Sequence, residues 1–245
     1  MPRFRSAMTA VFLMGLLVRA AGAAEPDAGS FDADGVKIHY TVQGTGEPVV
    51  LVHGLLASGW LNWDLPGVTG RLEKGYRVIA IDLPGHGGSD KPDKPEAYGT
   101  QMVEDVLLLM DHLKIKKAHV VGYSLGGIIT TKLLTLHPDR VRSATVGGVG
   151  WVRDKGRNLG LREHMPVRDR NDTFGLVVSS IGKLAITEEE LKAIKLPVEV
   201  IVGDQDVLKR ASVEPLRKVR PDWPVVEIKN AGHMSCIVKK EFAEA

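Results

Sequence analysis

Short apolar runs of strand length alternate with longer amphipathic segments along most of the chain. Residues 36–44 alternate apolar and polar side chains, which is typical of a half-exposed edge strand. Further runs are predominantly apolar and end in or near glycine, as expected of more deeply buried strands: 48–54, 76–85, 118–124, 139–148, 196–206 and 223–233. Each run is bounded by turn-forming residues, so each predicts a separate strand.

The segments between these runs carry helical spacing. In residues 101–114 the apolar positions recur every three or four residues, which places them on one face of a helix. Residues 125–138 and, with less regular spacing, 207–219 predict further helices, and a capping box from Thr187 to Glu190 predicts one at 187–194. Alternating strands and helices predict an α/β fold, with a mostly parallel sheet and helices on both faces. Ligands of such sheets bind at the carboxyl ends of the strands.

One segment, residues 149–186, interrupts the alternation. It is rich in Arg, Gly and Asp. It is also too long for a bare connection, because structureless loops beyond about 12–15 residues are uncommon in compact domains. We therefore predict a short lid, inserted at about 149–186 into a domain that spans residues 25–245.

The first residues of the chain, 1–24, have the composition of a secretory signal peptide. Arg3 and Arg5 precede an apolar stretch at 7–18, and small residues follow at 21–24. The apolar stretch is shorter than the ~20 residues that a spanning helix needs. We expect cleavage after the small residues, export to the periplasm or the medium, and no stable membrane insertion afterwards. An uncleaved membrane anchor is the alternative.

Composition narrows the class of protein further. The leader holds three of the 32 Lys and Arg residues and no acidic residue, so the remainder carries 29 basic against 30 acidic side chains. A domain with this balance lacks the excess of positive charge that is typical of proteins that bind nucleic acid. The single cysteine, Cys236, excludes an intrachain disulfide, and we interpret it as a buried free thiol.

Ser124 has a glycine two residues before it and another two residues after it, in the sequence VGYSLGG. Glycine inside a regular element costs about 0.5–1 kcal/mol relative to alanine, so Gly122 and Gly126 need a reason. The pattern G-x-S-x-G between a strand and a helix indicates a nucleophile elbow, where strand and helix pass close to each other. Free N–H groups at the helix start favour developing negative charge. We predict Ser124 as a nucleophile.

A serine nucleophile needs a base, and the base needs an orienting carboxylate. Among the eight histidines, His53 and His233 follow predicted strands at the same sheet edge as Ser124. His233 lies in the loop after the last strand, and we predict it as the base. Asp204 and Asp206 both follow the closing glycine of the preceding strand. Either fits the chain order Ser, Asp, His, and the pattern alone does not choose between them.

His53 and Gly54 end the strand that begins at residue 48, and we assign them a supporting role. The glycine permits a sharp turn that brings the Leu55 N–H toward the serine. A second N–H comes from Leu125, the residue after Ser124. Two such donors can stabilise the oxyanion of an acyl-transfer intermediate, and loss of one costs about 2.7–4 kcal/mol of transition-state stabilisation.

Together these motifs resemble the α/β-hydrolase fold superfamily, in the group of small bacterial esterase-like serine hydrolases. The matching segments follow the expected order: LVHGLL (51–56), IDLPGHGGSDKP (81–92), VGYSLGG (121–127), LPVEVIVGDQDVL (196–208) and NAGHM (230–234). The resemblance implies Asp206 as the carboxylate, with Asp204 as the fallback. It implies no metal and no cofactor.

The leading hypothesis is a serine hydrolase that cleaves a small-molecule carboxylic ester through an acyl-enzyme intermediate. Hydrolysis of a C–C bond and cofactor-free peroxidation are alternatives on the same triad. A binding protein on a non-catalytic hydrolase scaffold is the alternative of a different class. We rank it below catalysis because Ser124, His233 and a candidate aspartate are all present.

Overall fold

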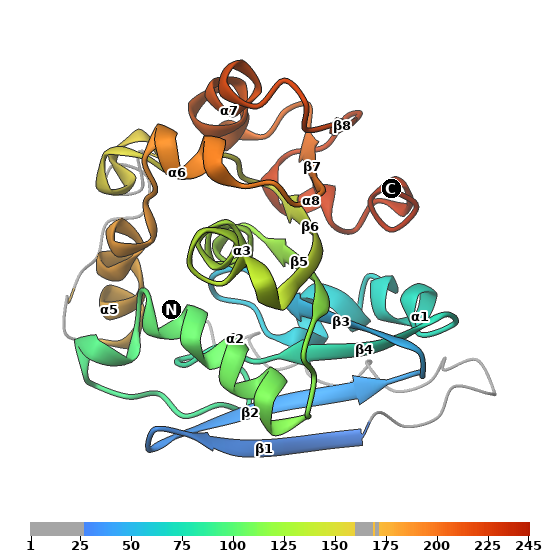
Figure 1. Ribbon diagram of the computed structural model, residues 1–245, viewed down its shortest axis with the longest axis vertical. Helices are drawn as coiled ribbons and strands as arrows, with labels where there is room; N and C mark the ends of the chain where they lie inside the picture. Colours follow the sequence, from blue (N-terminus) through green and yellow to red (C-terminus); the bar gives the residue numbers. More distant parts are fainter. Residues whose placement is uncertain (1–26, 160–168, 170–171) are drawn as a thin grey trace, which may run out of the picture.

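An eight-stranded sheet runs through the part of the chain that the computed structural model describes, residues 27–159, 169 and 172–245 (Figure 1). The strands are β1 (Asp27–Ala33), β2 (Val36–Gln43), β3 (Glu47–Val52), β4 (Tyr76–Ile81), β5 (Ala118–Tyr123), β6 (Val141–Gly147), β7 (Val198–Gly203) and β8 (Val225–Ile228). Their order is β1-β2-β4-β3-β5-β6-β7-β8. The strands from β3 to β8 run parallel, whereas β1 and β2 are antiparallel to their neighbours. The predicted α/β fold with a mostly parallel sheet is confirmed.

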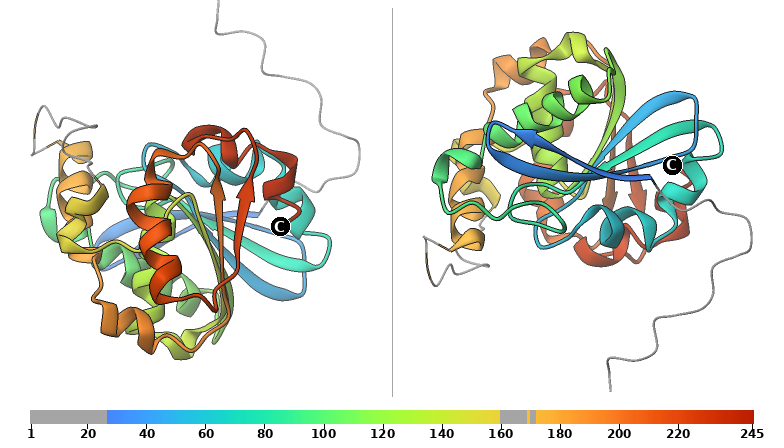
Figure 2. Two further views of the ribbon diagram at one scale, coloured as in Figure 1. Left: turned by 90° about the horizontal axis from the view of Figure 1, so that it is seen from above. Right: turned by 90° about the horizontal axis from the view of Figure 1, so that it is seen from below.

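Helices cover both faces of this sheet, as the views from above and below show (Figure 2). The α-helices are α1 (Val68–Leu72), α2 (Gln101–His112), α3 (Leu125–Leu136), α5 (Thr173–Ser180), α6 (Glu188–Ala193), α7 (Glu214–Val219) and α8 (His233–Cys236). Shorter 3₁₀ or π turns are η1 (Trp60–Asp64), η2 (Pro95–Ala97), η3 (Pro138–Arg140), η4 (Asp154–Leu159), η5 (Ile181–Leu184), η6 (Lys209–Val213) and η7 (Lys240–Phe242). The segment predicted as one helix at 207–219 divides into η6 and α7, with Pro215 in the first turn of α7.

Two apolar clusters hold these helices against the sheet, one on each face. The larger cluster joins buried side chains of α2, α3, α6 and α7 to the strands, and the smaller one joins η1, α1, α8 and η7 to the opposite face. In α3, ten of the twelve residues are buried. The start of α3 therefore has little freedom to move, which matters for the residue directly before it.

β1 is a strand that the sequence analysis did not predict. It lies outside β2, so β2 is not the edge strand that its alternating pattern indicated. Only two side chains of β1 are buried, Phe31 and Ala33, which is too few to produce an apolar pattern. The missed signal was Asp34-Gly35, whose positive φ angles of 52° and 86° form the two-residue turn between the strands.

The segment that interrupts the alternation forms helices where the structure describes it, as η4, α5 and η5. Residues 160–168 and 170–171 of the predicted lid, like the predicted leader 1–24, lie outside the described residues. Asp172 caps α5 by accepting a hydrogen bond from the Gly175 N–H (2.6 Å). The two ends of the segment are tied together, because the Trp151 indole donates to the Ile186 carbonyl (2.9 Å).

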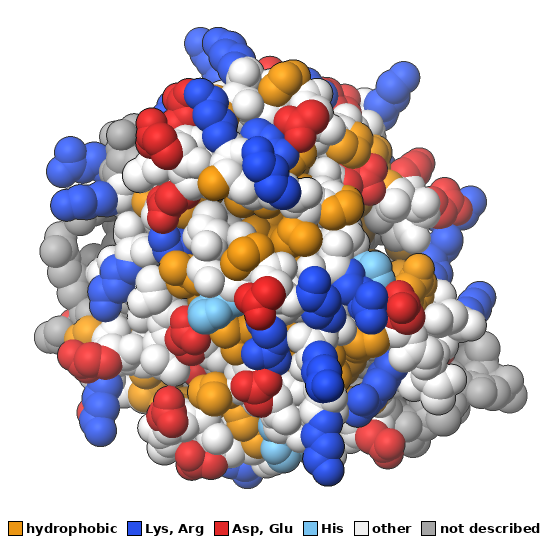
Figure 3. All heavy atoms as spheres, viewed as in Figure 1, with side chains coloured by type: hydrophobic (Ala, Val, Ile, Leu, Met, Phe, Trp, Pro, Cys, Tyr) orange, Lys and Arg blue, Asp and Glu red, His pale blue; other side chains and the backbone are white. Residues whose placement is uncertain are grey.

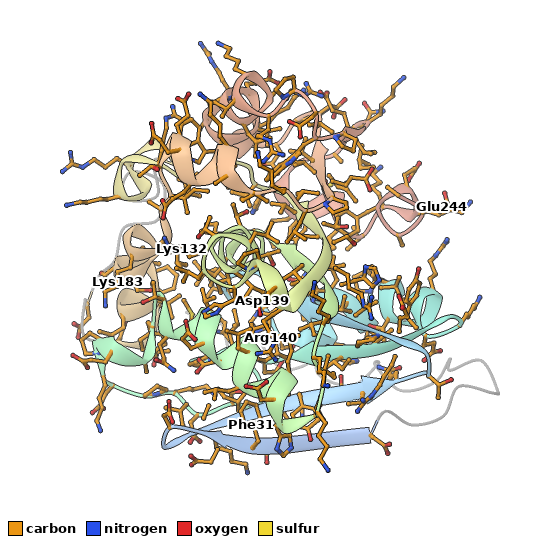
Figure 4. All side chains as sticks on the ribbon, viewed as in Figure 1. Phe31, Lys132, Asp139, Arg140, Lys183 and Glu244 are labelled. Atoms are coloured by element: carbon orange, nitrogen blue, oxygen red, sulfur yellow. The ribbon has the colours of Figure 1, made fainter. Side chains whose placement is uncertain are left out.

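Charged side chains of both signs are interspersed over the face shown in Figure 3. Some link neighbouring elements. Arg140 of η3 and Lys132 of α3 are labelled in Figure 4. Arg140 reaches Asp111 of α2 (2.5 Å), and Lys132 reaches Glu190 of α6 (3.4 Å). Such pairs contribute at most about 1 kcal/mol each, so the apolar clusters dominate stability. None of the helices in the described ranges has the length and apolar composition needed to cross a membrane.

Asp105 of α2 is a carboxyl group buried without full compensation. It is 1% exposed, its Oδ1 accepts a hydrogen bond from the Gln101 amide (3.2 Å), and its Oδ2 has no partner among the described residues. Desolvation by burial raises the pKa of Asp105 to about 7. The folded state therefore binds more protons than the unfolded state between about pH 4 and 7, and stability contributed by this group falls as pH rises through that window.

We expect Asp105→Asn to stabilise the fold at pH 8 by on the order of 2 kcal/mol, because the amide removes a buried charge. The gain should shrink as pH falls toward 4, where the wild-type carboxyl is already protonated. Thermal unfolding at both pH values measures it. Asp139→Asn is the matched control, since Asp139 is exposed. An equal gain at both pH values would contradict the prediction.

Candidate active site

Ser124 sits at the junction of β5 and α3 in a strained backbone conformation. Its φ of 52° and ψ of −112° lie outside the regions that non-glycine residues favour. Its N–H donates to the Gly147 carbonyl of β6 (2.8 Å), which fixes the turn. Strain of this kind persists only where surrounding structure imposes it, and it clusters at functional sites. The buried helix α3 supplies that constraint.

The glycines around Ser124 leave no room for a side chain. A Cβ on Gly122 would lie 2.2 Å from the Gly126 carbonyl oxygen, and a Cβ on Gly126 would lie 1.9 Å from the Val52 carbonyl oxygen. Both contacts are with backbone, which cannot rotate away. The close passage of strand and helix that the sequence pattern indicates is therefore present.

We expect Gly126→Ala to lower the free energy of unfolding by about 3 kcal/mol or more, because backbone must shift to admit the methyl group. Gly70→Ala is the matched control, since nothing lies within 4 Å of a Cβ added to this residue of α1. It should change stability by less than about 1 kcal/mol. Urea unfolding measures both variants, and equal stability would contradict the steric argument.

His233 lies beside Ser124 at the carboxyl ends of the strands. It is the first residue of α8, after β8, and its side chain is 21% exposed. Its Nε2 lies 2.8 Å from the Ser124 hydroxyl oxygen, and its Nδ1 lies 2.8 Å from Asp206 Oδ2. Since a carboxylate only accepts, Nδ1 carries the proton in this contact. Nε2 is then free to accept the proton of the serine.

The structure separates the two candidate aspartates. The Asp206 side chain is fully buried, and its second oxygen accepts a hydrogen bond from the Leu208 N–H (2.8 Å). Asp204 is exposed and accepts from the Ala231 N–H (3.2 Å), two residues before His233. Backbone hydrogen bonds from Ala231 and Asn230 lower the pKa of Asp204. Asp206 thus faces the imidazole, whereas Asp204 shapes the loop that carries it.

The turn after β3 brings a second set of backbone groups to the serine. A Cβ on Gly54 would lie 3.3 Å from the Ser124 Cβ, so the two residues are in contact. The Gly54 N–H donates to Asn62 Oδ1 (2.8 Å), a buried anchor that the sequence analysis missed. Within the described ranges, neither the Leu55 N–H nor the Leu125 N–H donates to another residue. Both are available to a ligand oxygen.

Known proteins share this fold and motif order. Residues 47–174, just over half of the chain, match a family model described as alpha/beta hydrolase fold. The chain belongs to the α/β-hydrolase family. The resemblance read from its motifs to the α/β-hydrolase fold superfamily is therefore confirmed.

Individual relatives of this α/β hydrolase have different activities. A dihydrolipoyllysine-residue acetyltransferase component of the acetoin cleaving system of Pseudomonas putida is 42% identical over 170 residues, which cover 69% of this chain and 44% of that protein. An uncharacterized carboxylesterase of Bacillus subtilis (strain 168) is 25% identical over 224 residues, which cover 76% and 73%. The crystal structure of a meta-cleavage product hydrolase has a TM-score of 0.69 at 25% identity, covering 84% of this chain and 90% of the other. The chain spans less than half of the length of the first curated relatives that it matches, between 20% and 44%.

His53 supports the turn after β3, and both of its ring nitrogens bond backbone groups rather than the serine. It is fully buried, and its Nε2 accepts a hydrogen bond from the Leu83 N–H (3.0 Å). Its Nδ1 therefore carries the proton and donates to the Gly54 carbonyl (2.7 Å). Desolvation lowers the pKa of His53 to about 4, so the ring is neutral near pH 7. With both nitrogens engaged, His53 links the loops after β3 and β4.

Asp82, at the end of β4, is a second buried support that the sequence analysis did not single out. Its Oδ1 accepts from the Gly59 N–H (2.7 Å), and its Oδ2 accepts from the Gly88 N–H (2.8 Å) and from the His39 ring (3.0 Å). It thereby joins the loop around Gly59 to the glycine-rich loop after β4. In the sequence, the pair Gly87-Gly88 could have indicated this support. A Cβ on Gly87 would lie 2.1 Å from the Asp82 carboxylate, so only glycine allows so close an approach.

One hollow in the described part of the chain lies away from the triad. A cavity of about 810 Å³ opens near the amino ends of β7 and β8, lined by residues that include Ser143, Lys195 and Trp223. The triad lies at the opposite, carboxyl ends of the strands. Cys236 is buried and free, and burial raises the pKa of its thiol to about 11. In the described part of the chain, no group of three His, Cys, Asp or Glu side chains is arranged to hold a metal ion.

Proposed function

We propose that this α/β hydrolase cleaves a small-molecule carboxylic ester through an acyl-enzyme intermediate. The observation that carries the proposal is the continuous hydrogen-bonded row from Ser124 through His233 to Asp206, with both contacts at 2.8 Å. In this arrangement the carboxylate holds the imidazole in the tautomer that accepts the serine proton. The serine is thus poised to act as a nucleophile without any group having to move.

The reaction follows from the geometry in two halves. The Ser124 hydroxyl oxygen attacks the ester carbonyl while His233 Nε2 takes its proton, and the N–H groups of Leu55 and Leu125 stabilise the oxyanion. His233 then gives the proton to the departing alcohol, which leaves an acyl group on the serine. Water attacks that acyl group while His233 takes its proton. The bond between Ser124 Oγ and the acyl group then breaks, His233 returns the proton to Oγ, and the acid leaves. Asp206 stays ionised throughout and stabilises the imidazolium.

The names of two similar proteins point to different bonds as the one cleaved. The Bacillus subtilis carboxylesterase supports ester cleavage, and the match covers 76% of this chain. The meta-cleavage product hydrolase supports the alternative of C–C bond hydrolysis. We favour the ester, because an alkoxide leaving group needs only the proton that His233 holds after the first step. A carbon leaving group also needs stabilisation of a carbanion.

A substrate panel tests the proposal. The purified chain is assayed with p-nitrophenyl esters of graded acyl length and with a 1,3-diketone, and it is treated with a fluorophosphonate. We expect ester turnover and covalent labelling at Ser124, because both reactions need the serine activated by His233. Cleavage of the diketone alone would favour the C–C alternative. A folded chain that neither labels nor turns over an ester between about pH 5 and 9 would favour a binding protein.

We further propose that the hydrolase is exported. Two arginines, a short apolar stretch and a run of small residues within 1–24 support a cleavable leader. We expect intact-mass analysis of protein from a native host to give an N-terminus at Ala24 or Glu25. Recovery of soluble protein that begins at Met1 would contradict export by cleavage.

A further inference from the structure

We propose that Tyr123 is a positioning residue, which holds the backbone of His233 so that the imidazole stays in line with Ser124. The inference rests on the proposed serine-hydrolase function and adds a residue to it. Tyr123 is the last residue of β5 and directly precedes the nucleophile. Its hydroxyl donates a hydrogen bond to the His233 carbonyl oxygen at 2.5 Å, across 110 residues of chain.

The phenol side chain is itself held rigidly. Tyr123 is 4% exposed, and the Phe242 ring packs edge-on against it with centroids 5.6 Å apart. Gly148, which follows β6, lies between the phenol and the base. A Cβ on Gly148 would come within 2.8 Å of Tyr123 Cζ and 3.2 Å of His233 Cε1. These contacts restrict the hydroxyl to one position, within hydrogen-bonding distance of the His233 carbonyl oxygen.

The loop that carries His233 is bonded to the chain after β7 through Ala231, whose N–H donates to Asp204 Oδ1 (3.2 Å) and whose carbonyl accepts from the Gln205 N–H (3.0 Å), while its outer side is exposed. Helix α8 is only four residues long, and Met234 and Val238 are 81% and 59% exposed. The imidazole is held by the Ser124 and Asp206 side chains, and the backbone behind it is held by Tyr123. Because Tyr123 ends β5 and the nucleophile is the next residue, the same strand end locates both reacting groups. Preorganisation of this kind requires rigid elements rather than loops.

The hydroxyl stays a donor over the working range of pH. Burial, together with the nearby Cys236 and Asp206, raises the pKa of Tyr123 above its usual value. The phenol is therefore neutral wherever the imidazole is neutral. The tether persists under all conditions in which the triad can act.

Tyr123→Phe is the direct test, because it keeps the ring and removes only the hydroxyl. A misplacement of about 1 Å in reacting groups can cost ~100-fold in rate. We expect kcat for an ester substrate to fall by about 10- to 100-fold with KM changed by less than about twofold. The rate of Ser124 labelling by a fluorophosphonate should fall in proportion, since both reactions need the same Ser–His alignment. The thermal unfolding temperature should change by only a few degrees.

Tyr98→Phe is the matched control. Its hydroxyl also donates to a backbone carbonyl, that of Pro92, at 2.6 Å, and Tyr98 is 1% exposed. It makes no contact with the triad that the structure records. It should therefore lose a similar buried hydrogen bond without loss of kcat. A second substitution at position 123, with 4-aminophenylalanine, keeps a donor of similar reach and should retain most of the wild-type rate.

The outcomes separate this inference from the proposed function. If the wild type turns over ester and labels at Ser124, but Tyr123→Phe matches it or falls no further than Tyr98→Phe, the positioning role is wrong. If Tyr123→Phe does not fold, the 4-aminophenylalanine protein decides: near-wild-type kcat supports the tether, and a folded protein of low kcat contradicts it. If the wild type neither turns over nor labels, the proposed function fails, and the inference fails with it.

Discussion

Ser124→Ala is expected to lower kcat for ester hydrolysis by about 10³- to 10⁶-fold, which is the largest effect that we predict for any single substitution. The substitution removes only the hydroxyl group, and the hydrogen bond from the residue 124 N–H to the Gly147 carbonyl oxygen remains. The elbow should therefore keep its conformation, and circular dichroism should show an unchanged fold. The residual rate should reflect water attacking substrate held by the Leu55 and Leu125 amides.

A second serine–histidine contact supplies the control for this substitution. Ser143 Oγ lies 2.7 Å from His119 Nδ1, and the other ring nitrogen lies 3.2 Å from Glu47. This pair lies near the amino ends of β5 and β6, at the opposite end of the strands from Ser124. Ser143→Ala should leave ester turnover and fluorophosphonate labelling within about twofold of the wild type. Loss of activity in Ser143→Ala with activity kept in Ser124→Ala would move the site to the other edge.

Asp206→Asn is expected to reduce kcat/KM by about 10⁴-fold, whereas Asp204→Asn should change it by no more than about threefold. An amide at position 206 can donate to the imidazole. The His233 imidazole would then carry its proton on Nε2 instead of Nδ1. A protonated Nε2 cannot accept the proton of the Ser124 hydroxyl. An amide at position 204 keeps an oxygen that can accept the Ala231 N–H. It therefore preserves the loop.

The two aspartate variants form a matched pair, because they make the same chemical change two residues apart. Steady-state kinetics on the preferred ester measures both, and thermal unfolding checks that each variant is folded. The structure predicts a gap of at least about 3000-fold in kcat/KM between them. The reverse ranking would transfer the orienting role to Asp204, and equal small losses would mean that His233 needs no carboxylate.

The sequence alone determined the elements whose cause is local. Seven residues, 121–127, contain the strand end, the serine and the small neighbours that the elbow requires, so the elbow could be predicted without knowing what surrounds it. The alternation of strands and helices likewise predicted the mostly parallel sheet. β1 escaped because a strand with only Phe31 and Ala33 buried has almost no apolar signal. Its pairing with β2 comes from the turn at Asp34-Gly35.

Only the tertiary structure decided which residues face one another across long separations. Asp204 and Asp206 follow the same strand, but burial and the position of α8 leave only Asp206 against the imidazole. His53 is at the right strand end for a base, yet both of its nitrogens are occupied by backbone groups of neighbouring loops. The contact from Tyr123 to His233 spans 110 residues and depends on side-chain packing. A pattern of nearby residues contains no information about such contacts, because the packing of the whole sheet edge sets them.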